Sequence, residues 1–237
     1  MCFHAAIPSS KALRKKFNAM EINYDAPEIF HVSGFQRPFL PVTLAQSPTA
    51  INAAQWKLIP NWITSEKDAA QYANTLNAAS ETIFEKPSFS KYIQHQHGLL
   101  FVNGFYEPHQ PAYQKETTHY LIQHPQQEIF TLGIVYSHWL DPFSQTSKTT
   151  FSIITTPASA FMENIHNVKK RMPLIISPQE REEWLQARKA EEISSFFKPS
   201  DVPLVAHQVK RLSTTKNTNT PEQQLPFTPD VQQSLFD

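Results

Sequence analysis

The chain has 237 residues and a mass of 27.2 kDa, and its 40% hydrophobic content with 17 Phe indicates one large folded domain or two small ones. Four glycines, with no GxGxxG and no GxxxxGK[ST] segment, exclude glycine-rich phosphate loops. Lys and Arg balance Asp and Glu at 21 each, which argues against a tight, sequence-blind binder of duplex DNA. A single cysteine excludes a disulfide framework and a cysteine zinc site, and no apolar run approaches the ~18 residues of a membrane span, so we expect a cytoplasmic protein.

The first half of the chain mixes short strands and helices. Residues 2–7 are apolar and predict a strand that holds the N-terminus, and Ser9 and Ser10 are candidate N-caps for a helix over residues 11–20. The pattern then predicts a strand at 41–45 and helices at 66–76 and 87–94.

The second half is richer in β-branched and aromatic runs. Pro157 is suited to the first position of a helix that ends near residue 165, and residues 178–190 form a charged amphipathic helix pattern. Strands are predicted at 99–107, 119–124, 129–140, 151–156, 172–176 and 202–212. Many strands with few βαβ alternations predict an α+β fold built on antiparallel or mixed sheets.

The composition changes near residue 213 to Thr, Asn, Gln and Pro. Such a stretch buries too little apolar surface to offset chain entropy, so we expect residues 213–237 to be a mostly disordered tail. The folded domain is then predicted to span residues 1–212.

The one cysteine, Cys2, follows directly on Met1. If Met1 is removed, an α-amine with a pKa near ~8 and a thiol with a pKa near ~8.5 share one residue. This 1,2-aminothiol condenses with an aldehyde, first as an imine and then, by thiol attack, as a thiazolidine ring. The alternative is that Cys2 is an incidental second residue.

Three further polar residues interrupt apolar patterns. Asn77 follows a predicted helix, Glu107 ends a predicted buried strand, and His166 lies between a helix and the segment RMPLII. Each has an ordinary explanation when taken alone: a helix C-cap, a surface residue at a strand end, and a loop or core histidine.

The ordered set of segments around these residues resembles the SRAP family, the SOS-response-associated peptidases that include a mammalian abasic-site sensor and its bacterial counterparts. The segments are Met1-Cys2, WKLIPNW at 56–62, NAASET at 77–82, EKPSF at 85–89, GFYE at 104–107, FSIITTPA at 151–158 and IHNVKKRMPLII at 165–176. The resemblance covers residues 1 to about 212. It implies a single compact α+β domain with a barrel-like, mostly antiparallel sheet core, flanking helices and a groove for single-stranded DNA.

The resemblance also implies covalent capture of abasic sites by the mature N-terminal cysteine. Cys2 is then expected to supply the amine and the thiol, and Asn77 to hold the amine and the sugar. Glu107 is expected to shuttle the proton that opens the cyclic sugar, helped by a pKa that burial raises. His166 is expected to act in ring opening, imine chemistry or reversal of the crosslink.

DNA contacts follow from the same resemblance. Pro41 and Trp62 match positions that wedge and stack bases, and Thr155 matches a hydroxyl near the site. Lys169, Lys170 and Arg171 are expected to face phosphates. The chain departs from the family at four positions, which are His4 for Arg, Ala79 for Arg, Asn103 for Asp and Pro108 for Trp. We therefore expect weaker DNA binding than in a typical member.

The segment QQSLF at 232–236 looks like the pentapeptide that binds the bacterial sliding clamp. Leu235 and Phe236 would fill an apolar pocket and Gln232 would bind at its rim. A clamp partner and a nucleoid-associated location are the resulting expectations, and a chance match is the alternative.

Two other functions stay open at the level of sequence: a non-catalytic module that binds single-stranded DNA, and a cysteine peptidase that acts on its own N-terminus or on other proteins. No metal or cofactor is expected, because His95 and His97 form an isolated pair and are expected to lie at the surface.

Overall fold

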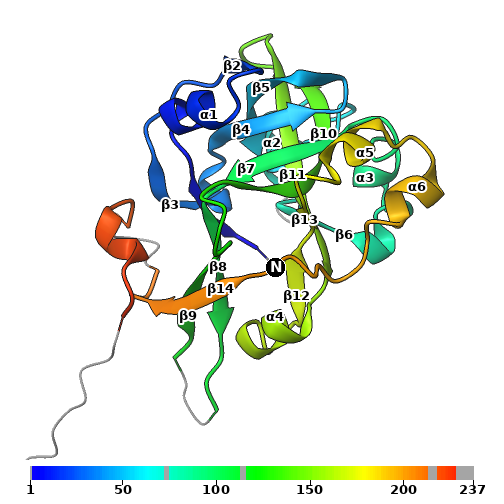
Figure 1. Ribbon diagram of the computed structural model, residues 1–237. Coiled ribbons are helices and arrows are strands. Elements are labelled where there is room, and N and C mark those ends of the chain that lie inside the picture. Colours follow the sequence, from blue (N-terminus) through cyan, green and yellow to red (C-terminus); the bar gives the residue numbers. More distant parts are fainter. Residues whose placement is uncertain (1, 72–74, 113–115, 213–217, 228–237) are drawn as a thin grey trace, which may run out of the picture.

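The computed structural model describes residues 2–71, 75–112, 116–212 and 218–227 (Figure 1). The strands are β1 (His4–Ile7), β2 (Glu21–Asn23), β3 (Ile29–Ser33), β4 (Phe39–Leu44), β5 (Ser47–Trp56), β6 (Asn77–Ala79), β7 (His97–Val102), β8 (Gly104–His109), β9 (Thr118–Gln123), β10 (Phe130–Leu140), β11 (Ser147–Pro157), β12 (Arg171–Pro173), β13 (Ile175–Ile176) and β14 (Val205–Val209). The helices are α1 (Ser10–Lys16), α2 (Glu66–Gln71), α3 (Pro87–Ser90), α4 (Ala160–Ile165), α5 (Arg181–Gln186) and α6 (Ala190–Ser194), with 3₁₀ turns η1 (Gly34–Gln36), η2 (Ser80–Thr82) and η3 (Pro221–Gln224).

Five strands close into a barrel. β5, β4, β7, β10 and β11 are antiparallel neighbours in that order, and the ring closes where β11 pairs in parallel with β5 at Thr150–Gln55 and Phe151–Trp56. This confirms the expected α+β fold with a barrel-like, mostly antiparallel core. Alternating apolar residues of these strands fill the interior, where the rings of Trp56 and Phe151 stack with centroids 6.3 Å apart.

A second sheet lies against the barrel, with its strands in the order β14-β9-β8-β1-β3. The chain passes from one sheet to the other at Asn103, whose backbone N–H donates to the Ala6 carbonyl at 2.8 Å. The strand predicted at 99–107 is therefore two strands in different sheets. As a result Glu107, in β8, lies in the second sheet next to β1, which begins two residues after Cys2.

The outer face of the barrel packs against α3, α5 and α6. Trp184 is fully buried there, and its indole N–H donates to the Gly98 carbonyl at 2.9 Å. Gly98 has no room for a side chain, because a Cβ atom would come within 2.3 Å of the Thr43 carbonyl oxygen. His97 is also fully buried in this region, between the carbonyls of Ile93 and Trp184. The surface location expected for His97 is therefore wrong, whereas His95 is exposed.

The predicted helices are shorter in the structure than the sequence pattern indicates. Within the pattern over 178–190 the helix is α5, which ends at Gln186 because Ala187 leaves the helical conformation at ψ 137°, and α6 starts only at Ala190. In the helix predicted at 66–76, the structure describes α2 as Glu66–Gln71, and the next strand, β6, begins at Asn77. In the described part of the chain, no helix is long and apolar enough to cross a membrane.

The expected tail is partly folded. Residues 218–227, shown in orange to red at the left of Figure 1, form a packed segment that contains η3. Asn219 and Gln224 bond to the backbone of Phe30 in β3, and Phe227 bonds to Gln208 in β14. Polar side chains that satisfy strand edges, rather than apolar burial, hold this segment in place. We call residues Thr218–Phe227 the strap.

Candidate functional site

Cys2 is held at the junction of the two sheets. Its side chain is fully buried, and its thiol donates to the His4 carbonyl at 3.6 Å. Burial, with a further contribution from the charge of Glu107, raises the pKa of this thiol well above its ordinary value. The thiol is therefore protonated at neutral pH, and a nearby base must take its proton before it can attack.

Asn77 fixes the backbone of this cysteine. It begins β6, which pairs in parallel with β11 through Ile153, and its amide Nδ2 donates to the Cys2 carbonyl at 2.9 Å. The other amide atom, Oδ1, is buried and has no hydrogen-bond partner among the residues that the structure describes. A buried acceptor of this kind is available to a donor on Cys2 or on a bound molecule.

Glu107 and His166 form a carboxyl–imidazole pair beside the cysteine. Glu107 is fully buried in β8, and burial raises its pKa to about 7. His166 follows α4, and burial lowers its pKa. Its Nδ1 lies 2.9 Å from the Arg171 carbonyl and so carries the proton of the neutral ring, which leaves Nε2 as the acceptor.

Nε2 of His166 lies 4.0 Å from Oε2 of Glu107. This distance exceeds that of a hydrogen bond, so a proton could move between the two groups only through a bridging atom. A carboxyl with a pKa of about 7 and an imidazole that presents Nε2 toward it can together give and accept a proton at one point. That is the capacity that sugar ring opening and imine formation require.

Arg171, which was expected to face a phosphate, is hydrogen-bonded to Thr155 and Glu81 instead. The Arg171 guanidinium donates to both carboxylate oxygens of Glu81, at 2.7 and 2.9 Å, and also to the hydroxyl and carbonyl of Thr155. The Arg171 hydrogen bond in turn lowers the pKa of Glu81. This clasp ties η2 to β11 and β12, so Arg171 already has protein partners for the donors with which it would bind a phosphate.

The two neighbouring lysines lie in the loop before β12. Lys169 is exposed, and Lys170 forms a 3.3 Å ion pair with Glu163. Both partners of that pair are exposed, so it restrains Lys170 only weakly. The expected phosphate contacts of these lysines remain predictions.

Pro41 lies within β4, in the strand that the pattern predicted, and is buried opposite Ala53. Its expected role as a wedge between bases stays a prediction. Phe35 in the turn after β3 is 66% exposed, and its ring lies 5.2 Å from that of Phe3, the residue after Cys2. An aromatic residue inside the turn-forming segment SGFQRPF was the available signal.

Trp62 is 38% exposed, as a base-stacking residue must be in part. One face of its ring stacks on Tyr92 with centroids 6.1 Å apart, and the Lys91 ammonium lies 5.2 Å from its centroid. The tail residues Gln232, Leu235 and Phe236 lie outside the described residues.

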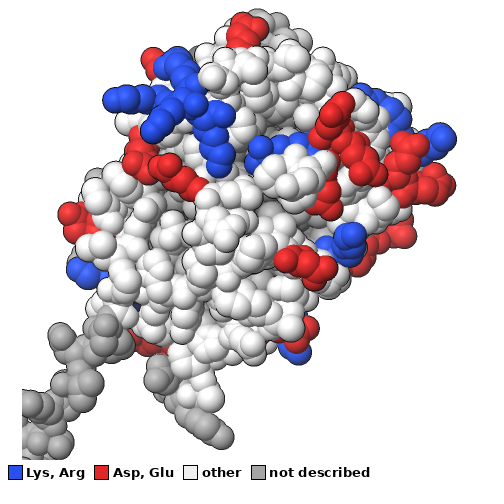
Figure 2. Space-filling model, in the orientation of Figure 1, with Lys and Arg blue, Asp and Glu red and all other residues white. Residues whose placement is uncertain are grey.

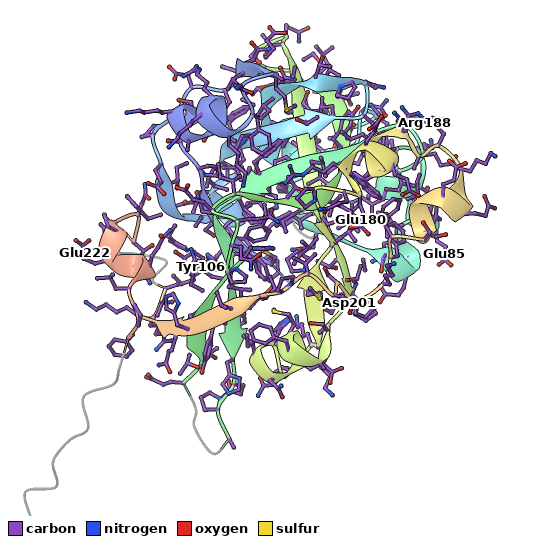
Figure 3. All side chains as sticks on the ribbon, viewed as in Figure 1. Glu85, Tyr106, Glu180, Arg188, Asp201 and Glu222 are labelled. Atoms are coloured by element: carbon purple, nitrogen blue, oxygen red, sulfur yellow. The ribbon has the colours of Figure 1, made fainter. Side chains whose placement is uncertain are left out.

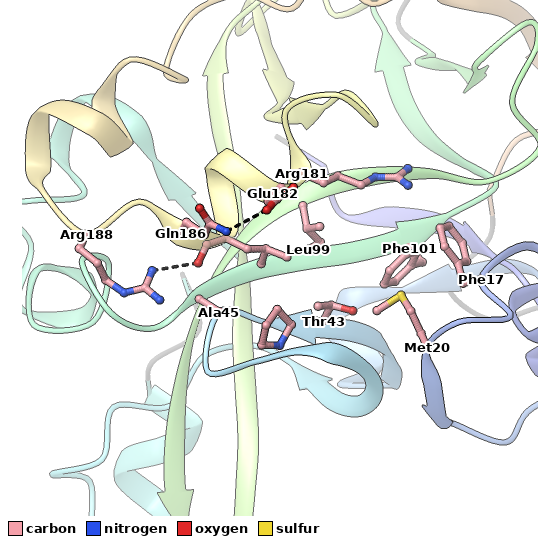
Figure 4. A pocket seen from close by; sticks show the side chains of 12 residues that line it. Phe17, Met20, Thr43, Ala45, Leu99, Phe101, Arg181, Glu182, Gln186 and Arg188 are labelled. Atoms are coloured by element: carbon pink, nitrogen blue, oxygen red, sulfur yellow. Dashed lines mark hydrogen bonds between the residues drawn. The ribbon is translucent and has the colours of Figure 1, made fainter.

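Surface charge and cavities are two further features of the described residues that bear on the location of the site. On the face shown in Figure 2, basic side chains gather at one corner over α1, which carries Lys11, Arg14, Lys15 and Lys16, and much of the face below is uncharged. A cavity of about 440 Å³ lies between α1, β7 and α5 and is lined by Phe17, Met20, Leu99, Phe101 and Arg181 among others (Figure 4). It shares no lining residue with the cysteine site. No group of three or more metal-ligating side chains occurs within the described ranges.

The site therefore combines a buried cysteine at position 2, an amide on its carbonyl and a carboxyl–imidazole pair. The chain belongs to the SRAP (SOS response associated peptidase) family, whose model matches residues 1–214. This confirms the family resemblance drawn from the sequence.

The curated relatives include the abasic site processing protein YoqW of Bacillus subtilis, 30% identical over 179 residues that cover 74% of this chain and 76% of YoqW. The abasic site processing protein HMCES of Rattus norvegicus is 24% identical, and the match covers 71% of this chain and 54% of HMCES.

Solved structures that share the fold include the following two. A protein from Bacteroides thetaiotaomicron superposes with a TM-score of 0.87 at 29% identity, over 96% of this chain and all of that protein. A protein from Bordetella bronchiseptica has a TM-score of 0.74 at 20% identity, over 89% of this chain and all of that protein.

Proposed function

We propose that this protein processes abasic sites, and that it does so by forming a covalent crosslink between its mature N-terminal Cys2 and an abasic site in single-stranded DNA. The observation that carries the proposal is the convergence of Cys2, Asn77, Glu107 and His166 from four separate segments. The names of YoqW and HMCES as abasic site processing proteins support it.

The first step opens the cyclic hemiacetal of the abasic sugar to its aldehyde. The carboxylic acid form of Glu107, which its raised pKa maintains near neutrality, protonates the ring oxygen. An oxygen atom between Glu107 and His166 fits their 4.0 Å separation, and His166 Nε2 takes the proton of the sugar hydroxyl as the carbonyl forms.

The second step joins protein and sugar. The α-amine that removal of Met1 generates attacks the aldehyde carbon, and loss of one water molecule gives the imine. The free Asn77 Oδ1 is suited to accept from this amine, because the same side chain already holds the Cys2 carbonyl. The thiol then adds to the imine carbon, its proton passes to the nitrogen, and a thiazolidine ring results.

The decisive experiment is intact-protein mass spectrometry after incubation with a single-stranded oligonucleotide that carries one abasic site. We expect a protein without Met1 and a heat-stable adduct whose mass is the sum of the two components less one water. Cys2→Ala should give no adduct. Retention of Met1, or no adduct from the wild-type protein, would overturn the proposal.

One observation favours a second candidate, a non-catalytic module that binds single-stranded DNA. Ala79 removes one basic side chain from the motif NAASET, and Glu81 neutralises Arg171. A protein of this kind would bind an intact oligonucleotide and an abasic one equally and form no covalent product in the same experiment.

The peptidase activity in the family description concerns, in this chain, the bond between Met1 and Cys2. We propose that the Glu107–His166 pair assists its hydrolysis. If so, Glu107→Gln expressed in a host without methionine aminopeptidase activity keeps Met1, whereas the wild-type protein loses it.

The clamp contact of the segment at 232–236 likewise stays a proposal, tested by a pull-down that compares the wild-type protein with the double variant Leu235→Ala and Phe236→Ala.

A further inference from the structure

The second sheet ends in two edge strands, and one segment of the chain is hydrogen-bonded to both. β3 and β14 are its edge strands, and the strap, Thr218–Phe227, bonds to both. On β3, the Phe30 N–H donates to Asn219 Oδ1 at 2.8 Å, and Gln224 Nε2 donates to the Phe30 carbonyl at 3.1 Å. On β14, the Phe227 N–H donates to the Gln208 carbonyl at 2.8 Å, and His207 bonds to the Gln224 carbonyl at 2.7 Å.

A chain of side chains leads from the strap toward the nucleophile. The Thr218 hydroxyl bonds to Nδ1 of His31, which is 7% exposed, and Nε2 of His31 lies 3.0 Å from Nδ1 of His4. The two imidazole rings also stack, with centroids 5.1 Å apart. His4 is the first residue of β1, and its carbonyl accepts the Cys2 thiol.

The two nitrogens that face each other share one proton, so one ring donates and the other accepts. Both ring nitrogens of His31 are hydrogen-bonded, so the bond from Nδ1 to Thr218 sets the ring orientation in which Nε2 bonds to His4. The ring of Tyr106, labelled in Figure 3, packs edge-on against His31, and its hydroxyl donates to the Phe30 carbonyl at 2.6 Å. These contacts restrain β3 and the start of β1 together.

We propose that His31, oriented by the strap, is a positioning residue that holds Cys2 in register with Asn77 and Glu107. The inference rests on the proposed crosslinking function. Backbone pairing supports it, since β3 contacts the first residues of the chain directly through His4–Ser33 and through the Gly34 N–H to the Phe3 carbonyl at 2.9 Å. Loss of the His31 contacts shifts the terminal amine relative to the aldehyde, and a misplacement of this kind slows a reaction far more than it weakens binding.

The test compares four full-length variants in single-turnover crosslinking with saturating abasic oligonucleotide. His31→Phe keeps the ring but removes both bonds, and Thr218→Val removes the hydroxyl at constant shape. We expect both to lower the rate constant by at least about tenfold. His31→Gln, which can donate to His4 and accept from Thr218, should restore most of the rate.

His207→Phe is the matched control, because it breaks a strap contact at the β14 edge without touching His31. Its rate should equal that of the wild-type protein. Affinity for an intact oligonucleotide, measured by fluorescence anisotropy, should be unchanged in all four variants. Equal rates in His31→Phe and the wild-type protein, or an equal loss in His207→Phe, would overturn the positioning role. Absence of any adduct from the wild-type protein would instead remove the proposed function itself.

Discussion

Burial sets the acid strength of Glu107, and the pH dependence of crosslinking should report it. The reaction needs the carboxyl protonated, below its pKa of about 7, and the α-amine free, above a pKa near ~8. The wild-type rate is therefore expected to peak between these values and to fall on either side.

The variant Glu107→Gln removes the alkaline limit of the pH profile, which the carboxyl sets. The amide cannot give a proton, so the maximal rate should drop by at least about 100-fold. The residual crosslinking rate of the variant should rise with pH as the amine loses its proton and then level off, without the decline at alkaline pH. Rates measured by gel shift from pH 5 to pH 9 test this, and an alkaline decline that persists in the variant would assign the acid to another group.

The two nucleophiles of Cys2 can be separated by one substitution. Cys2→Ser keeps the α-amine but lacks the thiol, and its hydroxyl is a poorer nucleophile toward the imine. We expect the serine variant to form an adduct that is lost on heating and that survives once cyanoborohydride has reduced it. Wild-type adduct should resist heating without reductant. A heat-stable adduct from the serine variant would rule out the thiazolidine.

The hydrogen bonds between Arg171 and Glu81 join two elements, η2 and β12, and we expect them to oppose DNA binding. Glu81→Gln should release part of the guanidinium to a phosphate and so raise the affinity for single-stranded DNA several-fold at low salt. The variant also loses a charge-assisted pair, with a cost to folding on the order of 1 kcal/mol. Anisotropy titrations and urea unfolding measure the two effects, and Glu183→Gln, at an exposed position of α5 outside the clasp, is a control for charge.

The sequence predicted the family and the barrel-like α+β fold, whereas the roles of the residues at the cysteine site stay predictions. Asn77, Glu107 and His166 stand in recognisable segments, and the structure brings Glu107 and His166 to 4.0 Å. The motif around Pro41 could not show that β4 lies between β5 and β7, where the proline is buried. Nor could it show that Phe35, in the turn before β4, is exposed. Strand neighbours are decided by tertiary pairing, which local periodicity does not record.

The strap shows a second limit. Its composition predicts disorder because few of its residues can be buried. It is ordered by amide side chains that satisfy two strand edges, and those edges exist only after the sheet has formed. Similarly, His97 was expected at the surface, and the packing of Trp184 from a segment 87 residues away encloses it.

Across the whole molecule, a balanced charge limits how strongly the protein can attract DNA. Each phosphate that a basic side chain neutralises adds about 0.7 to the slope of log affinity against log salt for a single strand. Ala79→Arg places a cation in β6 beside the clasp, at the position where the motif lost one. We expect tighter binding at low salt and a slope steeper by about 0.7.

Gln179→Arg adds the same charge at an exposed position away from the site and controls for net charge. If long-range attraction alone mattered, both variants would gain affinity equally and the slope would not distinguish them. A steeper slope in Ala79→Arg alone would show that position 79 lies on the path of the strand. Equal slopes in both variants would place the DNA elsewhere and contradict the expectation that Ala79 weakens DNA binding.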